Sequence, residues 1–125
     1  MAKPQGFPKT LRLRSQKEIA RVFRRGRYHR LGVLQAKTLP ALGQEPRFMI
    51  SVKKSVGSAP ERNRIKRLVR EAIRLNVRKL NHPFDVCLFL TTPPPSRVGL
   101  AMIESELRRL FDRVTQSQHE DRGER

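Results

Sequence analysis

The positions of apolar residues along the chain predict three helices. Apolar side chains recur three and four residues apart over residues 15–25, about 58–80 and about 97–115, the spacing of a helix that buries one face. The first two segments open on a serine with a glutamate three residues later, as in a capping box. Gly26 follows the first segment, and we expect it to end that helix in a left-handed conformation.

Three further segments have the pattern of strands. Residues 32–39 and 47–52 alternate between apolar and polar side chains, whereas residues 84–90 form an apolar run that indicates a central strand buried on both faces. Cys87 in that run is expected to be a buried thiol. Residues 53–57 either extend the second strand, bulge or add another strand. The order α-β-β-α-β-α, or α-β-β-β-α-β-α with that strand, predicts a single two-layer α+β domain.

The two ends of the chain lack this patterning. Residues 1–14 combine four cations with two prolines and a glycine, so we expect a basic, extended arm. Residues 116–125 are polar and charged, which predicts a disordered tail. The expected organisation is therefore an N-terminal arm over residues 1–14, an α+β domain over residues 15–115, and a tail over residues 116–125.

Charge points to a polyanionic partner. Lys and Arg number 28 against 11 Asp and Glu, a net charge of +17. Residues 1–80 hold 22 basic and 4 acidic side chains, while residues 81–125 hold 6 and 7, so the excess is regional. Such a concentration is far above what solubility requires. The chain has neither a run of about 20 apolar residues nor an apolar secretory core, so we expect a cytoplasmic protein with no membrane partner.

The second predicted helix separates an apolar face from a cationic one. At 100° per residue the apolar side chains fall together: Ile65, Leu68, Val69, Ala72 and Ile73. The opposite side holds a strip of polar and basic residues: Asn63, Lys66, Arg67, Arg70, Arg74 and Arg78. Because residues 62–80 contain eight cations and one acid, the strip favours phosphate binding over a merely solvated surface. The aromatic content of 6% without tryptophan favours backbone or shape recognition over base stacking.

The residues give no sign of a catalytic centre belonging to the protein itself. The eleven acids form no recognisable pair, and the three histidines have neither zinc-ligand spacing nor a nearby nucleophile motif. A glycine-rich phosphate loop is also missing. We therefore expect no catalytic residue and no metal site, and any part in catalysis would consist of positioning another molecule.

Residues 51–71, with the sequence SVKKSVGSAPERNRIKRLVRE, resemble the signature of the bacterial ribonuclease P protein subunit. The pattern RNRxKRxxRE, which begins at Arg62, is its most specific part. The resemblance continues through residues 22–26 and through the proline-bounded last strand and final helix, and covers roughly residues 10–115.

This resemblance implies a fold and a function. The fold is α-β-β-β-α-β-α, a mixed four-stranded sheet with a left-handed β-α-β crossover, ribosomal protein S5 domain 2-like, against the usual right-handed rule. The function is that of a protein cofactor for a catalytic RNA, which with Mg²⁺ cleaves precursor tRNA at its 5′ end. The protein would bind that RNA and the 5′ leader of precursor tRNA, the RNA would hold most of the Mg²⁺, and the protein alone would be inactive.

The resemblance also assigns residues to both contacts. Facing the catalytic RNA it places Arg62, Asn63, Arg64, Lys66, Arg67, Arg70 and Arg74. Near the leader it places Ile19, Phe23, Lys37, Ser51, Lys53 and Lys54. Ile19 and Lys37 stand where the family commonly has aromatic rings, so we expect leader binding that is more electrostatic. The order Lys53-Lys54-Ser55 is shifted from the family's, and Thr91 and Thr92 stand where a basic residue often follows the last strand.

The leading alternative is a ribosomal protein that binds rRNA, because such proteins are also small, basic and α+β. The arginine-rich signature distinguishes the two, and co-sedimentation with ribosomes in stoichiometric amount would favour the ribosomal protein. A DNA-binding domain is a distant third, since no helix-turn-helix pair is evident.

Overall fold

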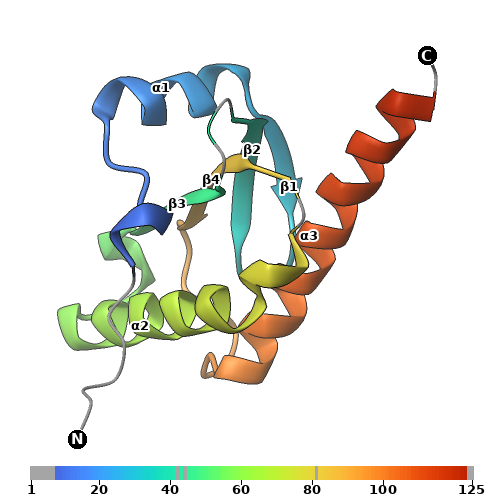
Figure 1. The fold of residues 1–125 in the computed structure, drawn as a ribbon. Coiled ribbons are helices and arrows are strands. Elements are labelled where there is room, and N and C mark those ends of the chain that lie inside the picture. Colours follow the sequence, from blue (N-terminus) through green and yellow to red (C-terminus); the bar gives the residue numbers. More distant parts are fainter. Residues whose placement is uncertain (1–7, 42, 44, 81, 124–125) are drawn as a thin grey trace, which may run out of the picture.

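The computed structural model describes residues 8–41, 43, 45–80 and 82–123, apart from the side chains of residues 117–123 (Figure 1). Its elements, in chain order, are η1 (Lys9–Leu11), α1 (Gln16–Arg25), β1 (Arg27–Arg30), β2 (Gln35–Pro40), β3 (Arg47–Val52), η2 (Lys54–Val56), α2 (Ala59–Asn76), η3 (Val77–Lys79), β4 (Phe84–Leu90) and α3 (Leu100–Gly123). The order of helices and strands is thus α-β-β-β-α-β-α, which confirms the longer of the two expected orders. No helix in the described part of the chain is long and apolar enough to cross a membrane.

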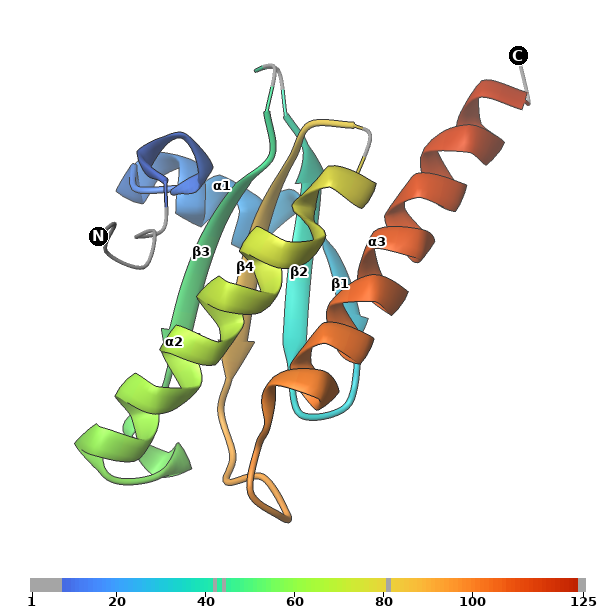
Figure 2. The same ribbon diagram turned by 60° about the horizontal axis from the view of Figure 1, so that its bottom comes forward.

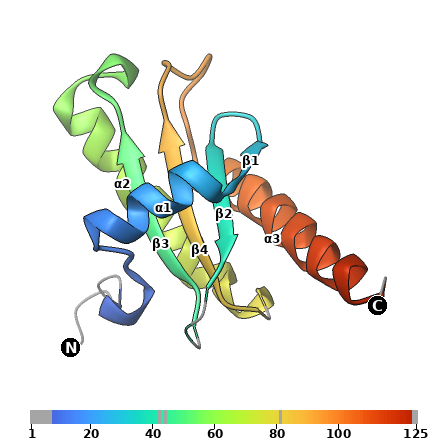
Figure 3. The same ribbon diagram turned by 90° about the horizontal axis from the view of Figure 1, so that it is seen from above.

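The four strands form one mixed sheet in the order β1-β2-β4-β3. The pairs β1–β2 and β2–β4 are antiparallel, and β3 and β4 are parallel. The chain passes from β3 to β4 through α2. In Figure 3, α2 lies behind the sheet and β4 lies to the right of β3, with both strands pointing up, so this crossover is left-handed. It is the exception to the handedness rule that the resemblance implied.

Helices cover both faces of the sheet, but unequally. Figure 2 shows α2 and α3 side by side on one face. The main core fills the space between them and the sheet, with Leu34, Ala36, Phe48, Val86, Leu88, Ile65, Val69, Ile73, Ile103, Leu107 and Leu110 among its members. On the other face α1 covers a smaller cluster of Leu13, Val22 and Cys87 (Figure 3). Most of the buried apolar residues therefore lie between the sheet and the layer formed by α2 and α3.

The additional strand was predicted at the wrong place. Residues 53–57 do not add a strand, because the chain turns after Lys53 into η2 and buries Val56 in the core. The additional strand is β1, whose pattern gave no apolar signal: only His29 is buried, and the other three side chains are exposed. This edge strand is fixed by its ladder with β2 and by side-chain hydrogen bonds, of Tyr28 with Gln35 and of His29 with Thr38.

The ends of several elements also differ from expectation. Residues 9–14 are not a free arm, since Leu11 and Leu13 are buried and the Leu13 amide donates to the Phe48 carbonyl at 2.8 Å; residues 1–7 of the predicted arm lie outside the described residues. The last helix begins at Leu100, after Gly99, and continues past residue 115 to Gly123, because no proline or glycine interrupts it before that point.

Gly26 was predicted in the left-handed conformation, and this was wrong. Its φ of −71° and ψ of 156° are extended. A Cβ at this position would lie 2.4 Å from the carbonyl oxygen of Val22 and 3.1 Å from that of Thr38. Glycine is needed here because the chain passes too close to two backbone carbonyls for any side chain.

Candidate nucleic-acid interface

The helix α2 begins with the predicted cap. Ser58 Oγ accepts a hydrogen bond from the Glu61 amide at 3.4 Å, and Pro60 occupies the first turn, where its missing N–H costs nothing. The predicted apolar face is also confirmed, since Ile65, Val69, Ala72 and Ile73 are buried and Leu68 packs against the same core. The cationic side of the helix therefore faces away from the sheet.

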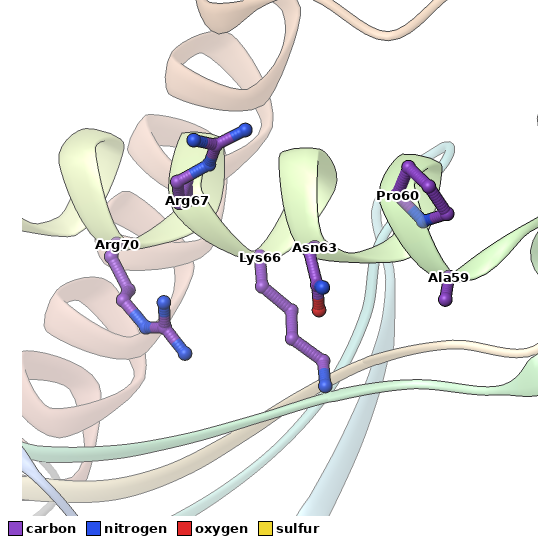
Figure 4. A pocket seen from close by; sticks show the side chains of 6 residues that line it. All are labelled: Ala59, Pro60, Asn63, Lys66, Arg67 and Arg70. Carbon is purple, nitrogen blue, oxygen red and sulfur yellow. The ribbon is translucent and has the colours of Figure 1, made fainter.

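The exposed side of α2 forms a groove of about 580 Å³. Its lining consists of Ala59, Pro60, Asn63, Lys66, Arg67 and Arg70. In Figure 4, Asn63, Lys66 and Arg70 project to one side of the helix and Arg67 to the other. Three of the lining residues are cations and none is an acid, so the groove suits an anion. Arg67 and Arg70 are exposed and can follow a phosphate backbone.

The remaining basic residues predicted to face RNA are bound within the protein. Arg62 Nη1 donates to the Gly57 carbonyl at 2.8 Å, and Arg64 donates to both carboxylate oxygens of Glu61 at 3.1 and 2.8 Å. The hydrogen bonds from Arg64 lower the pKa of Glu61. Arg74 pairs in the same way with Glu71 and lowers its pKa. The structure thus places Asn63, Lys66, Arg67 and Arg70 along one groove. Arg62, Arg64 and Arg74 instead make hydrogen bonds within the protein.

The residues predicted to bind the leader lie on the opposite face of the sheet, around α1. The ring of Phe23, 37% exposed, packs against Phe89 with centroids 5.6 Å apart. Lys37 Nζ donates to the carbonyl oxygen of Phe23 at 2.7 Å, so its ammonium lies at the C-terminal end of α1, where a cation is favourable. Ile19 packs against the small cluster under α1. This face of the sheet therefore carries an aliphatic side chain, Ile19, an aromatic ring, Phe23, and a hydrogen-bonded cation, Lys37.

The strand register places a row of half-buried and exposed side chains across the face of the sheet on which Phe23 packs. Across the sheet Arg30 pairs with Gln35, Gln35 with Phe89, and Phe89 with Ser51. Phe89 is the one residue of β4 that is not fully buried. Sequence reasoning proposed Ser51 but missed Gln35 and Phe89, because it treated residues 84–90 as buried on both faces. The alternation of β2 could have located Gln35, which shares a face with Lys37.

The proposed residues beyond this row lie at the end of β3. Lys53 and Lys54 are exposed, at the turn that enters η2. Ser55 Oγ donates to the carbonyl oxygen of Thr91 at 2.6 Å, which ties η2 to the end of β4. Thr91 Oγ1 accepts from Gln35 Nε2 at 3.0 Å. The resemblance leads one to expect a cation at this position. Thr91 instead links β2 and η2 to the end of β4 through its hydrogen bonds.

An ion-pair network fixes α1 over the sheet. Arg47 Nη1 and Nη2 each donate to Glu18 at 3.0 Å, and Nε and Nη2 donate to Asp85 at 3.1 Å. Asp85 is 2% exposed, so its charge needs this partner. The hydrogen bonds to Arg47 lower the pKa of Glu18. The network keeps the helix that carries Phe23 in a defined position on β3 and β4.

Comparison with known proteins gives one consistent match. The family model described as Ribonuclease P matches residues 7–115. The ribonuclease P protein component of Desulfatibacillum aliphaticivorans is 33% identical over 110 residues, which cover 88% of this chain and 92% of the relative. The corresponding component of Dictyoglomus thermophilum is 44% identical over 70 residues, 56% of this chain and 58% of that protein.

Solved structures agree with the sequence matches. The ribonuclease P protein of Thermotoga maritima, in complex with 1-(4-fluorophenyl)-2-thiourea, is similar with a TM-score of 0.72 at 25% identity, covering 82% of this chain and 98% of that one. The Staphylococcus aureus protein has the same fold, with a TM-score of 0.72 at 21% identity over 85% of this chain and 96% of that one. These matches do not favour a ribosomal protein. The chain belongs to the ribonuclease P protein family and is the protein component of that ribonuclease.

Proposed function

We propose that the groove on α2 binds the phosphate backbone of the ribonuclease P RNA. The observation that carries this proposal is the groove itself, whose lining includes Asn63, Lys66, Arg67 and Arg70 and no acid. Exposed arginines bind phosphate oxygens with two parallel hydrogen bonds, and Asn63 can both donate and accept. Arg62, Arg64 and Arg74 support this surface from their intramolecular contacts.

The 5′ leader of precursor tRNA binds, in this proposal, on the opposite face of the sheet. The predicted residues Phe23, Lys37 and Ser51 lie there, and Lys53 and Lys54 extend the surface at the end of β3. Because α1 and α2 cover opposite faces, the two RNA contacts do not compete for the same side chains (Figure 1). One small domain can then hold the catalytic RNA on one side and the substrate leader on the other.

The chemistry belongs, in this proposal, to the RNA. The groove residues do not fit a magnesium ion, because Lys66, Arg67 and Arg70 are cations and Asn63 offers a single amide oxygen. Mg²⁺ would therefore be held mainly by RNA phosphates. The contribution of the protein is to lower the repulsion between two polyanions, substrate and RNA, and to fix the leader in position. This role places the protein in the cytoplasm, with precursor tRNA as its substrate.

Reconstitution tests the proposal. The full chain is added to the ribonuclease P RNA at low Mg²⁺, and 5′ processing of a precursor tRNA is followed over time. We expect faster cleavage with the chain than without it, because phosphate neutralisation by the protein replaces part of the Mg²⁺ requirement. The chain without RNA should give no cleavage. Equal rates with and without the chain, at every Mg²⁺ concentration, would rule out the proposed role.

A further inference from the structure

Tyr28 is a half-exposed aromatic residue that belongs to neither of the two hydrophobic clusters. It is the only tyrosine of the chain, which has no tryptophan. It lies on β1, at the edge of the sheet, and is 48% exposed. The strand register pairs it directly with Lys37, so it belongs to the face of the sheet that carries Phe23 and Phe89. An exposed ring on an edge strand contributes little to the core and is available to bind a ligand.

Hydrogen bonds hold this ring in one orientation. The Tyr28 hydroxyl donates to Gln35 Oε1 at 2.8 Å, and Gln35 Nε2 donates to Thr91 Oγ1 at 3.0 Å. Three side chains from β1, β2 and the end of β4 are thereby linked across the sheet. Because the hydroxyl is bound at its far end, the ring loses little further freedom when a flat ligand stacks on it.

Exposed cations lie close to Tyr28 along the chain. Arg24 and Arg25 at the end of α1, and Arg30 on β1, are exposed. A ligand here should combine negative charges with a flat apolar surface, as a single-stranded RNA does through its phosphates and bases. An apolar peptide would lack the charge, and duplex RNA would not expose its bases for stacking.

We propose that Tyr28 stacks on a nucleobase of the single-stranded 5′ leader, as a binding residue that extends the leader surface onto β1. This inference rests on the proposed leader contact and adds one residue and one mode of binding to it. Gln35 and Thr91 act as positioning residues for the ring. The single-stranded character of the ligand is essential, because a base can stack on a side chain only where it is not stacked within a duplex.

The first test uses the holoenzyme reconstituted from the full chain and its RNA. Binding is measured for a precursor tRNA with a long leader and for one whose leader is cut back to a single nucleotide. Stacking on an aromatic residue predicts that Tyr28→Ala weakens binding of the long-leader precursor about 5- to 150-fold, and leaves the trimmed precursor unchanged. Tyr28→Phe keeps the ring and should retain most of the affinity. Leu75→Ala is the matched control, since Leu75 is 47% exposed and lies on α2, on the opposite side of the sheet.

The outcomes separate this inference from the function on which it rests. If the unmodified holoenzyme binds both precursors equally, the leader contact itself is wrong and the role of Tyr28 falls with it. If the unmodified holoenzyme prefers the long leader and Tyr28→Ala keeps that preference, only the inference is overturned. A loss of affinity for both precursors would likewise overturn it, because a general effect on folding or on RNA assembly does not depend on leader length.

A second measurement needs no variant. With one tyrosine and no tryptophan, the tyrosine fluorescence of the full chain reports on Tyr28 alone. A short unstructured oligoribonucleotide should quench this emission on binding, with binding followed by the anisotropy of a labelled copy. An abasic oligomer of the same length binds the cations but offers no base, and should leave the emission unchanged after correction for absorbance. Unchanged emission with the normal oligomer, whether or not it binds, would contradict the proposal.

Discussion

Arg64 and Val98 are joined by a hydrogen bond of 2.9 Å from Nη1 to the carbonyl oxygen, between α2 and the segment that leads into α3. Each nitrogen of the guanidinium donates within the protein, since Nε and Nη2 bind Glu61. Val98 is fully buried, so its carbonyl has little access to other donors. Arg64 is part of the RNRxKRxxRE signature, but in the structure its side chain links α2 to the segment before α3.

This geometry predicts different effects for two arginines of the signature. Arg67→Ala should lower the salt dependence of binding to the ribonuclease P RNA by about one unit of slope, because one phosphate contact is lost. Arg64→Ala should leave the slope unchanged and lower the thermal unfolding midpoint, because Glu61 and Val98 lose their donor. The measurement is RNA affinity across a salt series, with unfolding followed by circular dichroism. A slope reduced by about one in Arg64→Ala would show that Arg64 binds phosphate.

Replacing Gly26 by alanine should lower the free energy of unfolding, although its extended backbone conformation is one that any residue can adopt. A Cβ in Gly26→Ala would lie 2.4 Å from the Val22 carbonyl oxygen, so the end of α1 must move. Crowding of this kind costs about 1–3 kcal/mol, measured as the free energy of unfolding in urea. Gly99→Ala is the control, because nothing lies within 4 Å of a Cβ there, and its effect should stay under about 0.5 kcal/mol. Equal effects of the two substitutions would contradict the steric argument.

Local patterns predicted the helix that carries the candidate RNA surface. The capping serine at Ser58 and the buried positions of Ile65 and Val69 depend only on residues within a few turns of one another. Helical periodicity is independent of what packs on the helix. The sequence therefore predicted the cationic strip that includes Lys66 and Arg67 without any knowledge of the sheet, and the structure shows that part of this strip lines a groove.

Contacts between distant segments could not be predicted in this way. The partner of Arg64 lies 34 residues away, and β1 has its place because of pairing with β2 rather than an apolar pattern of its own. The turn between these strands depends on Glu106, 73 residues beyond Val33. Such pairings are set by the tertiary fold, and single-sequence periodicity contains no information about them.

Glu106 should be among the most important single residues for stability. Its buried carboxylate accepts the amides of Val33 at 3.0 Å and Leu34 at 2.8 Å. Hydrogen bonds to a charged acceptor contribute about 1.5–3 kcal/mol each, so Glu106→Ala should lower the free energy of unfolding by about 3 kcal/mol or more. Asp112→Ala, at an exposed position of the same helix, is the control and should have little effect. A small loss in Glu106→Ala would mean that water replaces the carboxylate.

Cys87 is predicted to be unreactive in the folded protein. Burial, and secondly the nearby charge of Asp85, raise the pKa of its thiol to about 12, so almost no thiolate forms at neutral pH. Dithiobis(nitrobenzoic acid), a thiol reagent, should therefore react with Cys87 only as fast as unfolding exposes the thiol. The rate should rise sharply on addition of denaturant through the unfolding transition. Rapid reaction of the native protein would show that the small cluster under α1 opens without global unfolding.

His29 should make the protein less stable in weakly acidic solution. The ring is buried, lies 3.0 Å from Thr38 Oγ1, and has a lowered pKa because burial, Arg113 and Arg27 all disfavour its charged form. The unfolded chain therefore binds a proton more readily than the folded protein. The contribution of His29 to the free energy of unfolding is present in full above the pKa of the unfolded chain, about 6.5. It is lost as the pH falls through that value towards the lower pKa of the folded protein, by at most about 1.4 kcal/mol per pH unit. The free energy of unfolding should thus decrease between about pH 7 and pH 5 in the unmodified chain, and much less so in His29→Gln. His82→Gln controls for removal of a histidine elsewhere, and a pH dependence that His29→Gln leaves unchanged would exclude His29 as its source.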